Sequence, residues 1–117
     1  IAYYDDGFES LEVAEYVGNG ATYGPGQWDR TVVDTGKVGR FASLDIDHHD
    51  VLHLSYFDDV NKDLKYASNL SGEWRTATVN QVGSVGEFSS IVVTLDNVRH
   101  ITCVGVIPSD DFRYYSF

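Results

Sequence analysis

The feature that most constrains this chain is an internal repeat. Residues 38–44 (VGRFASL) return 47 residues later as residues 85–91 (VGEFSSI), and residues 51–55 (VLHLS) return at the same offset as residues 98–102 (VRHIT). Residues 1–6 (IAYYDD) also match a later segment of the chain, LSYFDD. A fixed period of this length indicates one supersecondary unit that is repeated along the chain.

The complete unit contains four short runs rich in β-branched and aromatic residues. These runs span residues 41–47, 53–58, 64–68 and 74–80, and clusters of Asp, Asn, Ser and Gly separate them. Such runs with turn residues between them are typical of antiparallel strands. No segment keeps a helical spacing of apolar residues. We therefore predict an all-β fold.

The second run carries bulky side chains on both faces of its predicted strand. Leu54 and Tyr56 fall on one face, and His53 and Phe57 fall on the other. A sheet with one solvated face alternates more cleanly between apolar and polar residues. We expect the four-stranded sheet to be covered on both sides by similar sheets. Four strands in about 47 residues is the period of a β-propeller blade.

The strand order predicts a partial β-propeller of about two and a half four-stranded antiparallel blades. Residues 1–39 form an incomplete first blade without its first strand, residues 40–86 form a full blade, and residues 87–117 form a last blade without its fourth strand. Open sheet faces and edges favour association. We expect homo-oligomerisation to complete the ring, as a homodimer with six blades or a homotrimer with nine. The alternative is that the chain is a fragment of a longer protein.

Four short motifs link the chain to a known family. They are GxFxSL at residues 39–44, HLSYFD at 53–58, LKYA at 64–67 and GxW at 72–74. Together they resemble the blade repeats of sialidase-like, Asp-box-type β-propellers, which occur in secreted and phage-associated proteins. The resemblance implies a propeller fold and an extracellular or virion-associated location. It leaves the function open, because this fold carries many activities.

The family's sialidases use an arginine trio, a Tyr–Glu nucleophile pair and an Asp acid. The arginines of this chain lie outside any recognisable family motif: Arg30, Arg40, Arg75, Arg99 and Arg113. Glycoside hydrolysis also requires two carboxylates that flank the bond, and the sequence does not identify such a pair. We expect no catalytic residues and no cofactor.

The charge balance limits the partners. Eighteen acidic residues against eight basic ones give a formal net charge of −10, and lysine occurs only at Lys37, Lys62 and Lys65. This charge disfavours nucleic acid and anionic membrane surfaces. No apolar run approaches the roughly 18 residues that a membrane helix needs, so we expect no membrane insertion. An acidic, lysine-poor surface suits a high-salt medium. The alternative is that the charge only keeps an assembly soluble.

Aromatic residues supply the main binding candidates. Trp28 and Trp74 occupy the same repeat position. Tyr16, Tyr23 and Trp28 cluster around a glycine-rich loop at residues 17–26, which is longer than its counterpart in the second unit. An exposed aromatic ring offers a flat apolar face on which a sugar can stack, and long loops on rigid scaffolds often carry recognition. The alternatives are buried packing for the tryptophans and a role at an assembly junction for the loop.

Acidic residues supply weaker candidates. Asp58 and Asp59 recur as Asp5 and Asp6 at the end of the same strand, which indicates turn capping or a repeated carboxylate that faces a ligand. Three carboxylates near one turn have a spacing that calcium uses, and two histidines between them could hold a transition metal. These weak metal candidates are Asp45, Asp47 and Asp50, with His48 and His49. We predict a solvated turn there and no metal site.

His53 and His100 share one repeat position. Recurrence within one chain indicates a common structural role, such as a ring N–H that donates a hydrogen bond to a backbone carbonyl.

The sequence thus favours a non-catalytic recognition module on an oligomeric propeller, with carbohydrate as the candidate ligand. The main alternative is a structural component of an extracellular or virion assembly. A sialidase-like glycoside hydrolase comes third.

Overall fold

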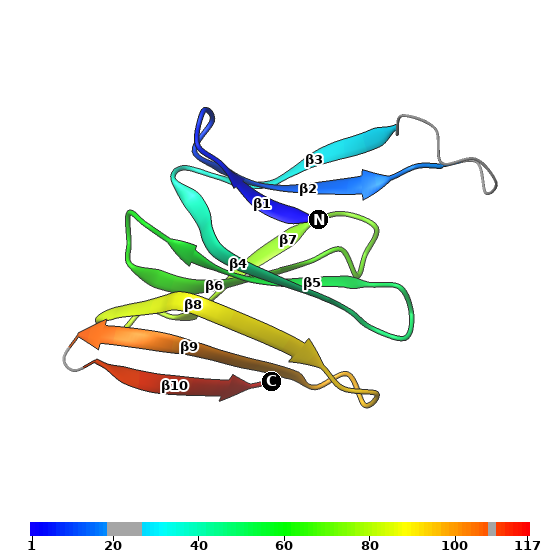
Figure 1. Ribbon diagram of the computed structural model, residues 1–117. Helices are drawn as coiled ribbons and strands as arrows, with labels where there is room; N and C mark the ends of the chain where they lie inside the picture. The colour runs from blue at the N-terminus through cyan, green and yellow to red at the C-terminus, as the bar shows by residue number, and fades with distance from the viewer. Residues whose placement is uncertain (19–26, 108–109) are drawn as a thin grey trace.

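The computed structural model describes residues 1–18, 27–107 and 110–117, and these residues form ten β-strands in three antiparallel sheets (Figure 1). The described residues contain no helix that could cross a membrane. The sheets contain three, four and three strands in chain order, which confirms the predicted strand order. Within each sheet every strand pairs with its neighbour in sequence.

The first sheet contains β1 (Ala2–Asp5), β2 (Ser10–Tyr16) and β3 (Trp28–Thr35). The middle sheet contains β4 (Val38–Ile46), β5 (Leu52–Asp58), β6 (Asp63–Ser68) and β7 (Arg75–Asn80). The third sheet contains β8 (Ser84–Val93), β9 (Arg99–Ile107) and β10 (Asp111–Ser116).

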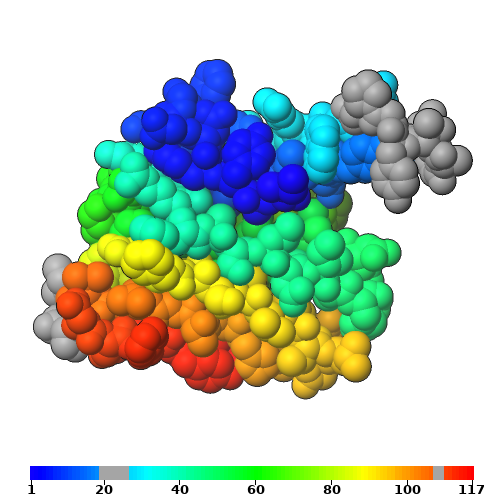
Figure 2. Space-filling model, in the orientation of Figure 1, coloured from blue at the N-terminus to red at the C-terminus, as the bar shows by residue number. Residues whose placement is uncertain are grey.

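The three sheets stack as layers, with the middle sheet between the other two (Figures 1 and 2). All seven residues of β5 are buried, because this strand is central in its sheet and the sheet is covered on both faces. This arrangement confirms the expectation that similar sheets shield the middle sheet on both sides. The stack that the described residues form is open, and they do not close the ring expected from the repeat.

Two apolar clusters fill the spaces between the sheets. The first cluster joins the first and middle sheets, and its buried members are Leu11, Val13, Val33, Val38, Leu52, Leu54, Tyr56 and Ala67. The second cluster joins the middle and third sheets, and its buried members are Leu64, Tyr66, Val85, Ile91, Ile101 and Cys103. Burial of apolar surface in these two layers is the main force that holds the sheets together.

The same backbone joint connects each sheet to the next. Gly39 of β4 lies so close to β2 that an added Cβ would lie 2.8 Å from the Cα of Leu11. Gly86, at the same repeat position in β8, would meet the Cα of Leu64 at 2.9 Å. Both glycines have a positive φ, +111° and +117°, which other residues rarely adopt. The repeat in sequence is therefore a repeat in how successive sheets dock.

The first strand of the middle sheet begins earlier than predicted, at Val38 instead of Phe41. Its register with β5 shifts twice, between Val38 and Arg40 and between Arg40 and Ser43. A bulge of this kind places Gly39 and Phe41 at positive φ. The alternation of apolar and polar residues is lost over the bulge. The sequence pattern therefore did not predict the start of the strand at Val38.

Candidate functional site

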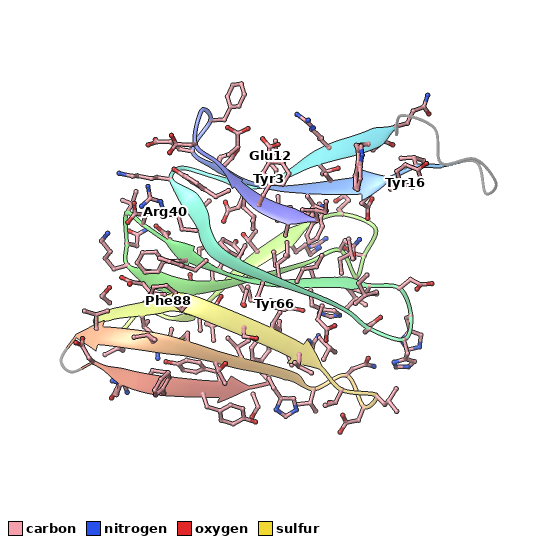
Figure 3. All side chains as sticks on the ribbon, in the orientation of Figure 1. Tyr3, Glu12, Tyr16, Arg40, Tyr66 and Phe88 are labelled. Carbon is pink, nitrogen blue, oxygen red and sulfur yellow. The ribbon has the colours of Figure 1, made fainter. Side chains whose placement is uncertain are left out.

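An exposed aromatic pair lies at the end of the first sheet. Tyr16 on β2 and Trp28 on β3 are register partners, and their ring centroids lie 5.5 Å apart in an edge-to-face arrangement. Tyr16 is 44% exposed and Trp28 is 45% exposed. Figure 3 labels Tyr16 at this end of β2, well away from Tyr3 and Glu12 on the same sheet. Tyr23 and the loop at residues 19–26 lie outside the described residues.

Trp74 has a different environment from Trp28, although the two share a repeat position. Trp74 is partly buried and packs against the apolar cluster between the first and middle sheets. The buried-packing alternative therefore describes Trp74, whereas Trp28 presents nearly half of its surface to solvent. Of the two tryptophans, Trp28 is the one that can offer a ring face to a ligand.

Asp58 caps the turn between β5 and β6. One of its carboxylate oxygens accepts hydrogen bonds from the backbone N–H groups of Val60 and Asn61, and the other accepts one from the Asn61 side chain. Burial alone would raise the pKa of Asp58, but these hydrogen bonds outweigh burial and lower the pKa. Asp5 accepts the equivalent bonds from Gly7 and Phe8. The recurrence of this carboxylate therefore follows from a repeated turn.

Asp59 lies beside Asp58 but faces a basic cluster. Its carboxylate lies 2.7 Å from the Lys62 ammonium, 3.7 Å from Lys37 and 3.8 Å from the Arg40 guanidinium. The hydrogen bond from Lys62 lowers the pKa of Asp59, and the positive charges of Arg40 and Lys37 add to this effect. Figure 3 labels Arg40 near the β1–β2 end of the first sheet. The carboxylate is thus already neutralised by three cations of the chain itself.

Two of the three carboxylates near the β4–β5 turn engage separate partners. Asp47 is buried and accepts hydrogen bonds from the backbone N–H groups of His49 and Val51. Asp45 accepts one from Val93 on the neighbouring sheet at 2.6 Å, and Asp50 is exposed. Among the described residues, no group of three His, Cys, Asp or Glu side chains is arranged to hold a metal ion.

A buried hydrogen-bonded chain lies behind that turn. The Nδ1 atom of His53 lies 2.6 Å from the Tyr66 hydroxyl, and its Nε2 lies 3.2 Å from the Asp47 carboxylate. Burial alone would raise the pKa of Asp47, but the N–H groups of Val51 and His49, together with His53, lower it to about 2. His53 is 1% exposed, so a substrate has no access to it. The described partners of the His53 ring are therefore side chains, a tyrosine and an aspartate, and not the backbone carbonyl that its repeat position suggested.

The same contact occurs at the equivalent repeat positions of the third sheet. The Nδ1 atom of His100 lies 2.6 Å from the Tyr114 hydroxyl, which reproduces the His53–Tyr66 contact at the equivalent positions. His100 and Tyr114 lie on the outer face of the third sheet, where Tyr114 is 60% exposed. The outer face also carries the exposed apolar side chains of Val92, the register partner of His100, and of Phe112, two residues before Tyr114 on β10.

The arginines for which contacts are described are dispersed. Arg40 lies over the Tyr4 ring, Arg99 lies between the rings of Tyr66 and Phe117, and Arg113 pairs with Asp111. Arg75 donates a hydrogen bond to Ser71. These contacts commit the guanidinium groups to structural roles in different parts of the stack. They do not form a shared anion-binding centre of the kind that a sialidase reaction needs.

A hollow that the sequence analysis did not identify lies between β7 of the middle sheet and β10 of the third. Its volume is about 530 Å³, within the range of ligand-binding cavities. Its lining is rich in aromatic residues and consists of Tyr66, Ala77, Thr78, Val79, Tyr114, Tyr115, Ser116 and Phe117. These residues come from strands that are distant in sequence, so no local motif marks the hollow.

Comparison with known proteins gives no family assignment: no protein-family model matches the chain, and no curated protein matches its sequence. The geometry of the described residues is therefore the basis for the functional proposal.

Proposed function

We propose that this chain is a non-catalytic recognition module whose three sheets are blades of an oligomeric β-propeller, with a carbohydrate as its ligand. The sialidase-like resemblance of its blade motifs agrees with this proposal. Two observations support it, one for the assembly and one for the ligand.

The observation that carries the assembly is the repeated joint between sheets. The contact of Gly39 with Leu11 recurs as the contact of Gly86 with Leu64, so the first and second sheets dock through the same backbone contact as the second and third. When copies continue a repeated head-to-tail contact, they form a ring if the rotation closes and an open filament if it does not. The exposed apolar side chains on the outer face of the third sheet offer surface for that contact. Two copies give six blades, and three give nine.

The ligand proposal rests on the Tyr16–Trp28 pair. Its two rings already contact each other across a strand pair. Little side-chain entropy is therefore lost when a sugar binds to them. A pyranose presents an apolar face of C–H groups that matches an aromatic ring, and its hydroxyls keep their contact with water. The net charge of −10 favours neutral or cationic ligands over anionic ones.

A second candidate function is a structural role in a larger assembly, and the repeat position of Trp28 favours it. Trp74, at the same position, packs against the cluster shared with the preceding sheet. By the same geometry, Trp28 in a closed ring packs against the last sheet of a neighbouring copy. In that case the pair is a junction contact and not a sugar platform.

Sedimentation velocity tests the assembly. We expect a single species with the mass of two or three chains. A compact monomer at micromolar concentration would rule out ring closure by this chain.

A glycan array with matched variants tests the ligand. We expect Trp28→Ala to abolish binding while its circular dichroism spectrum and oligomer mass stay unchanged. Phe8→Ala is the control, because Phe8 is an 80% exposed aromatic residue on the β1–β2 turn. If the wild type binds no glycan on the array and the Trp28→Ala variant no longer forms the oligomer, the structural role is supported instead.

A further inference from the structure

A shielded lysine–aspartate pair lies in the joint between the first and middle sheets. The Lys65 ammonium on β6 pairs with the Oδ2 atom of Asp34 on β3, and the two side chains are 16% and 17% exposed. Two other described lysines pair with Asp59, and their side chains are far more open: Lys37 is 44% exposed and Lys62 is 49% exposed. Bulk water therefore reaches the Lys65–Asp34 pair much less than it reaches these lysines.

Tyr56 on β5 completes the group. Its hydroxyl donates a hydrogen bond to Oδ2 of Asp34 at 2.7 Å, and the Lys65 ammonium lies 5.6 Å from the centre of its ring. Tyr56 is fully buried in the apolar cluster between the two sheets. Burial raises the pKa of Tyr56, and the hydrogen bond to Asp34 raises it further. The phenol therefore keeps its proton at neutral pH and presents it to Oδ2.

The two oxygens of the Asp34 carboxylate have different partners. Oδ2 lies between the Lys65 ammonium and the Tyr56 hydroxyl. Oδ1 accepts a hydrogen bond from the backbone N–H of Thr35 at 2.9 Å. One oxygen thus faces a nucleophile and a proton donor, whereas the other is held by a donor that can stabilise negative charge.

The joint between the middle and third sheets lacks this chemistry. Asn80 occupies the repeat position of Asp34, and its side chain donates a hydrogen bond to the Tyr115 hydroxyl at 2.9 Å. Arg113 occupies the repeat position of Lys65. A guanidinium stays charged in proteins and is not a nucleophile, whereas a shielded lysine amine is often one. The repeat by itself therefore does not require a lysine and an aspartate in the first joint.

We propose that Lys65 and Asp34 condense to an isopeptide bond that links β3 to β6. A proton passes from the ammonium to the carboxylate, and the neutral Nζ attacks Cγ of Asp34. The Nζ–Cγ bond forms and the Cγ–Oδ2 bond breaks. Tyr56 donates a proton to the leaving Oδ2 and regains one from the attacking nitrogen. Nζ thus loses two of its three hydrogens, and they leave with Oδ2 as one water molecule. The reaction is a condensation and needs no oxidant, reductant or co-reactant.

The fold supplies what this condensation needs. The amine and the carboxyl are held in contact, which replaces an encounter in solution by an intramolecular step. Limited access of water disfavours the charged forms of both groups and protects the amide from hydrolysis. The N–H of Thr35 stabilises the charge that develops on Oδ1, which becomes the amide carbonyl oxygen. The exposed Lys62–Asp59 pair has a similar contact, at 2.7 Å, but not the shielding.

Mass spectrometry of the denatured protein tests the bond. We expect the intact mass of the wild type to be lower than that of its sequence by one water molecule. Trypsin does not cleave after an acylated lysine, so we expect a branched peptide in which residues 31–37 (TVVDTGK) are joined to residues 63–75 (DLKYASNLSGEWR). The full mass of the sequence, with separate peptides that end at Lys37 and at Lys65, would overturn the proposal.

Lys62 is the control within the same digest. It also contacts an aspartate, but water reaches it, so we expect complete cleavage after Lys62. Lys65→Arg is the control variant, because arginine keeps the positive charge and does not condense. We expect this variant to have the full mass of its sequence and a lower melting temperature than the wild type, since a covalent cross-link restricts the unfolded chain.

A second source of the same mass loss is separated by this variant. The Asp6–Gly7 sequence can also lose one water molecule, by cyclisation of the aspartate onto the following backbone nitrogen. That loss does not depend on Lys65. A mass deficit that persists in Lys65→Arg, without the branched peptide in the wild type, would therefore overturn the proposal.

The role of Tyr56 is tested by the rate of condensation. Tyr56→Phe keeps the ring in the apolar cluster and removes the proton donor from Oδ2. We follow the mass deficit with time after cell-free synthesis and check the fold by circular dichroism. We expect Tyr56→Phe to slow condensation at least about a hundredfold, the usual size of a general-acid contribution. Condensation at the wild-type rate would overturn the proton transfer assigned to Tyr56.

Discussion

The Nδ1 atom of His53 lies 2.6 Å from the hydroxyl oxygen of Tyr66, deep between the middle and third sheets. The same 2.6 Å contact joins His100 and Tyr114 on the outer face of the third sheet. Tyr66 is 8% exposed and Tyr114 is 60% exposed. One hydrogen bond thus occurs twice in the same local structure, once shielded by a neighbouring sheet and once open to water.

These two His–Tyr hydrogen bonds allow the effect of burial on the free energy of unfolding to be compared. Tyr66→Phe leaves a buried ring nitrogen of His53 without its partner and removes the hydrogen bond that Arg99 donates to the Tyr66 hydroxyl, so we expect a loss of about 1–3 kcal/mol in the free energy of unfolding. Tyr114→Phe removes a bond that water replaces, and we expect a loss below about 0.5 kcal/mol. Urea denaturation at one protein concentration measures both. Equal losses would contradict the assigned burial of the two sites.

The joint between sheets predicts a steric effect at Gly39. Gly39→Ala combines an unfavourable φ of +111° with a Cβ that lies 2.8 Å from the Cα of Leu11. Gly36→Ala has a similar φ of +98° but meets no atom within 4 Å, so it isolates the backbone strain. We expect Gly36→Ala to cost about 1–2 kcal/mol and Gly39→Ala to cost about 1–3 kcal/mol more. Thermal unfolding of the two variants tests the difference, and similar costs would show that the sheets are not so closely joined.

The low pKa of Asp47 predicts a specific acid sensitivity. Its pKa is lowered from an ordinary value near 3.8 to about 2 in the folded protein, so its charge contributes stability above about pH 4 that is lost as the pH falls toward 2. Asp47→Asn has no proton to gain in this window. We expect the stability gap between the wild type and Asp47→Asn to narrow as the pH falls from 4 to 2. Asp50→Asn, at an exposed position in the same turn, is the control. A gap that stays constant over these pH values would contradict the prediction.

The net charge of −10 predicts a response to salt. Self-repulsion among surface carboxylates opposes the compact state, and dissolved ions screen it over about 10 Å at 0.1 M salt and about 3 Å at 1 M. We expect the melting temperature to rise between low and molar sodium chloride. Sucrose at equal osmolality controls for effects that do not depend on charge. A melting temperature that does not respond to salt would remove the high-salt interpretation of the composition.

The sequence by itself determined the strands and their order. Alternating β-branched and aromatic runs, with turn residues such as Asp58 between them, are local signals, and a strand needs little else to be recognised. The repeat also predicted that the middle sheet is covered on both faces. The early start of β4 was missed because the bulge at Gly39 breaks the alternation.

Only the tertiary structure decided which copy of each repeated residue is buried. Trp28 and Trp74, like His53 and His100, are equivalent in sequence and in strand position, yet Trp74 is more buried than Trp28 and His53 is more buried than His100. The hollow beside β10 likewise could not be predicted from the sequence, because its lining comes from strands that meet only in the folded stack. Burial depends on which sheet lies across the interface, and two residues at the same repeat position have the same local sequence pattern whether or not a sheet covers them.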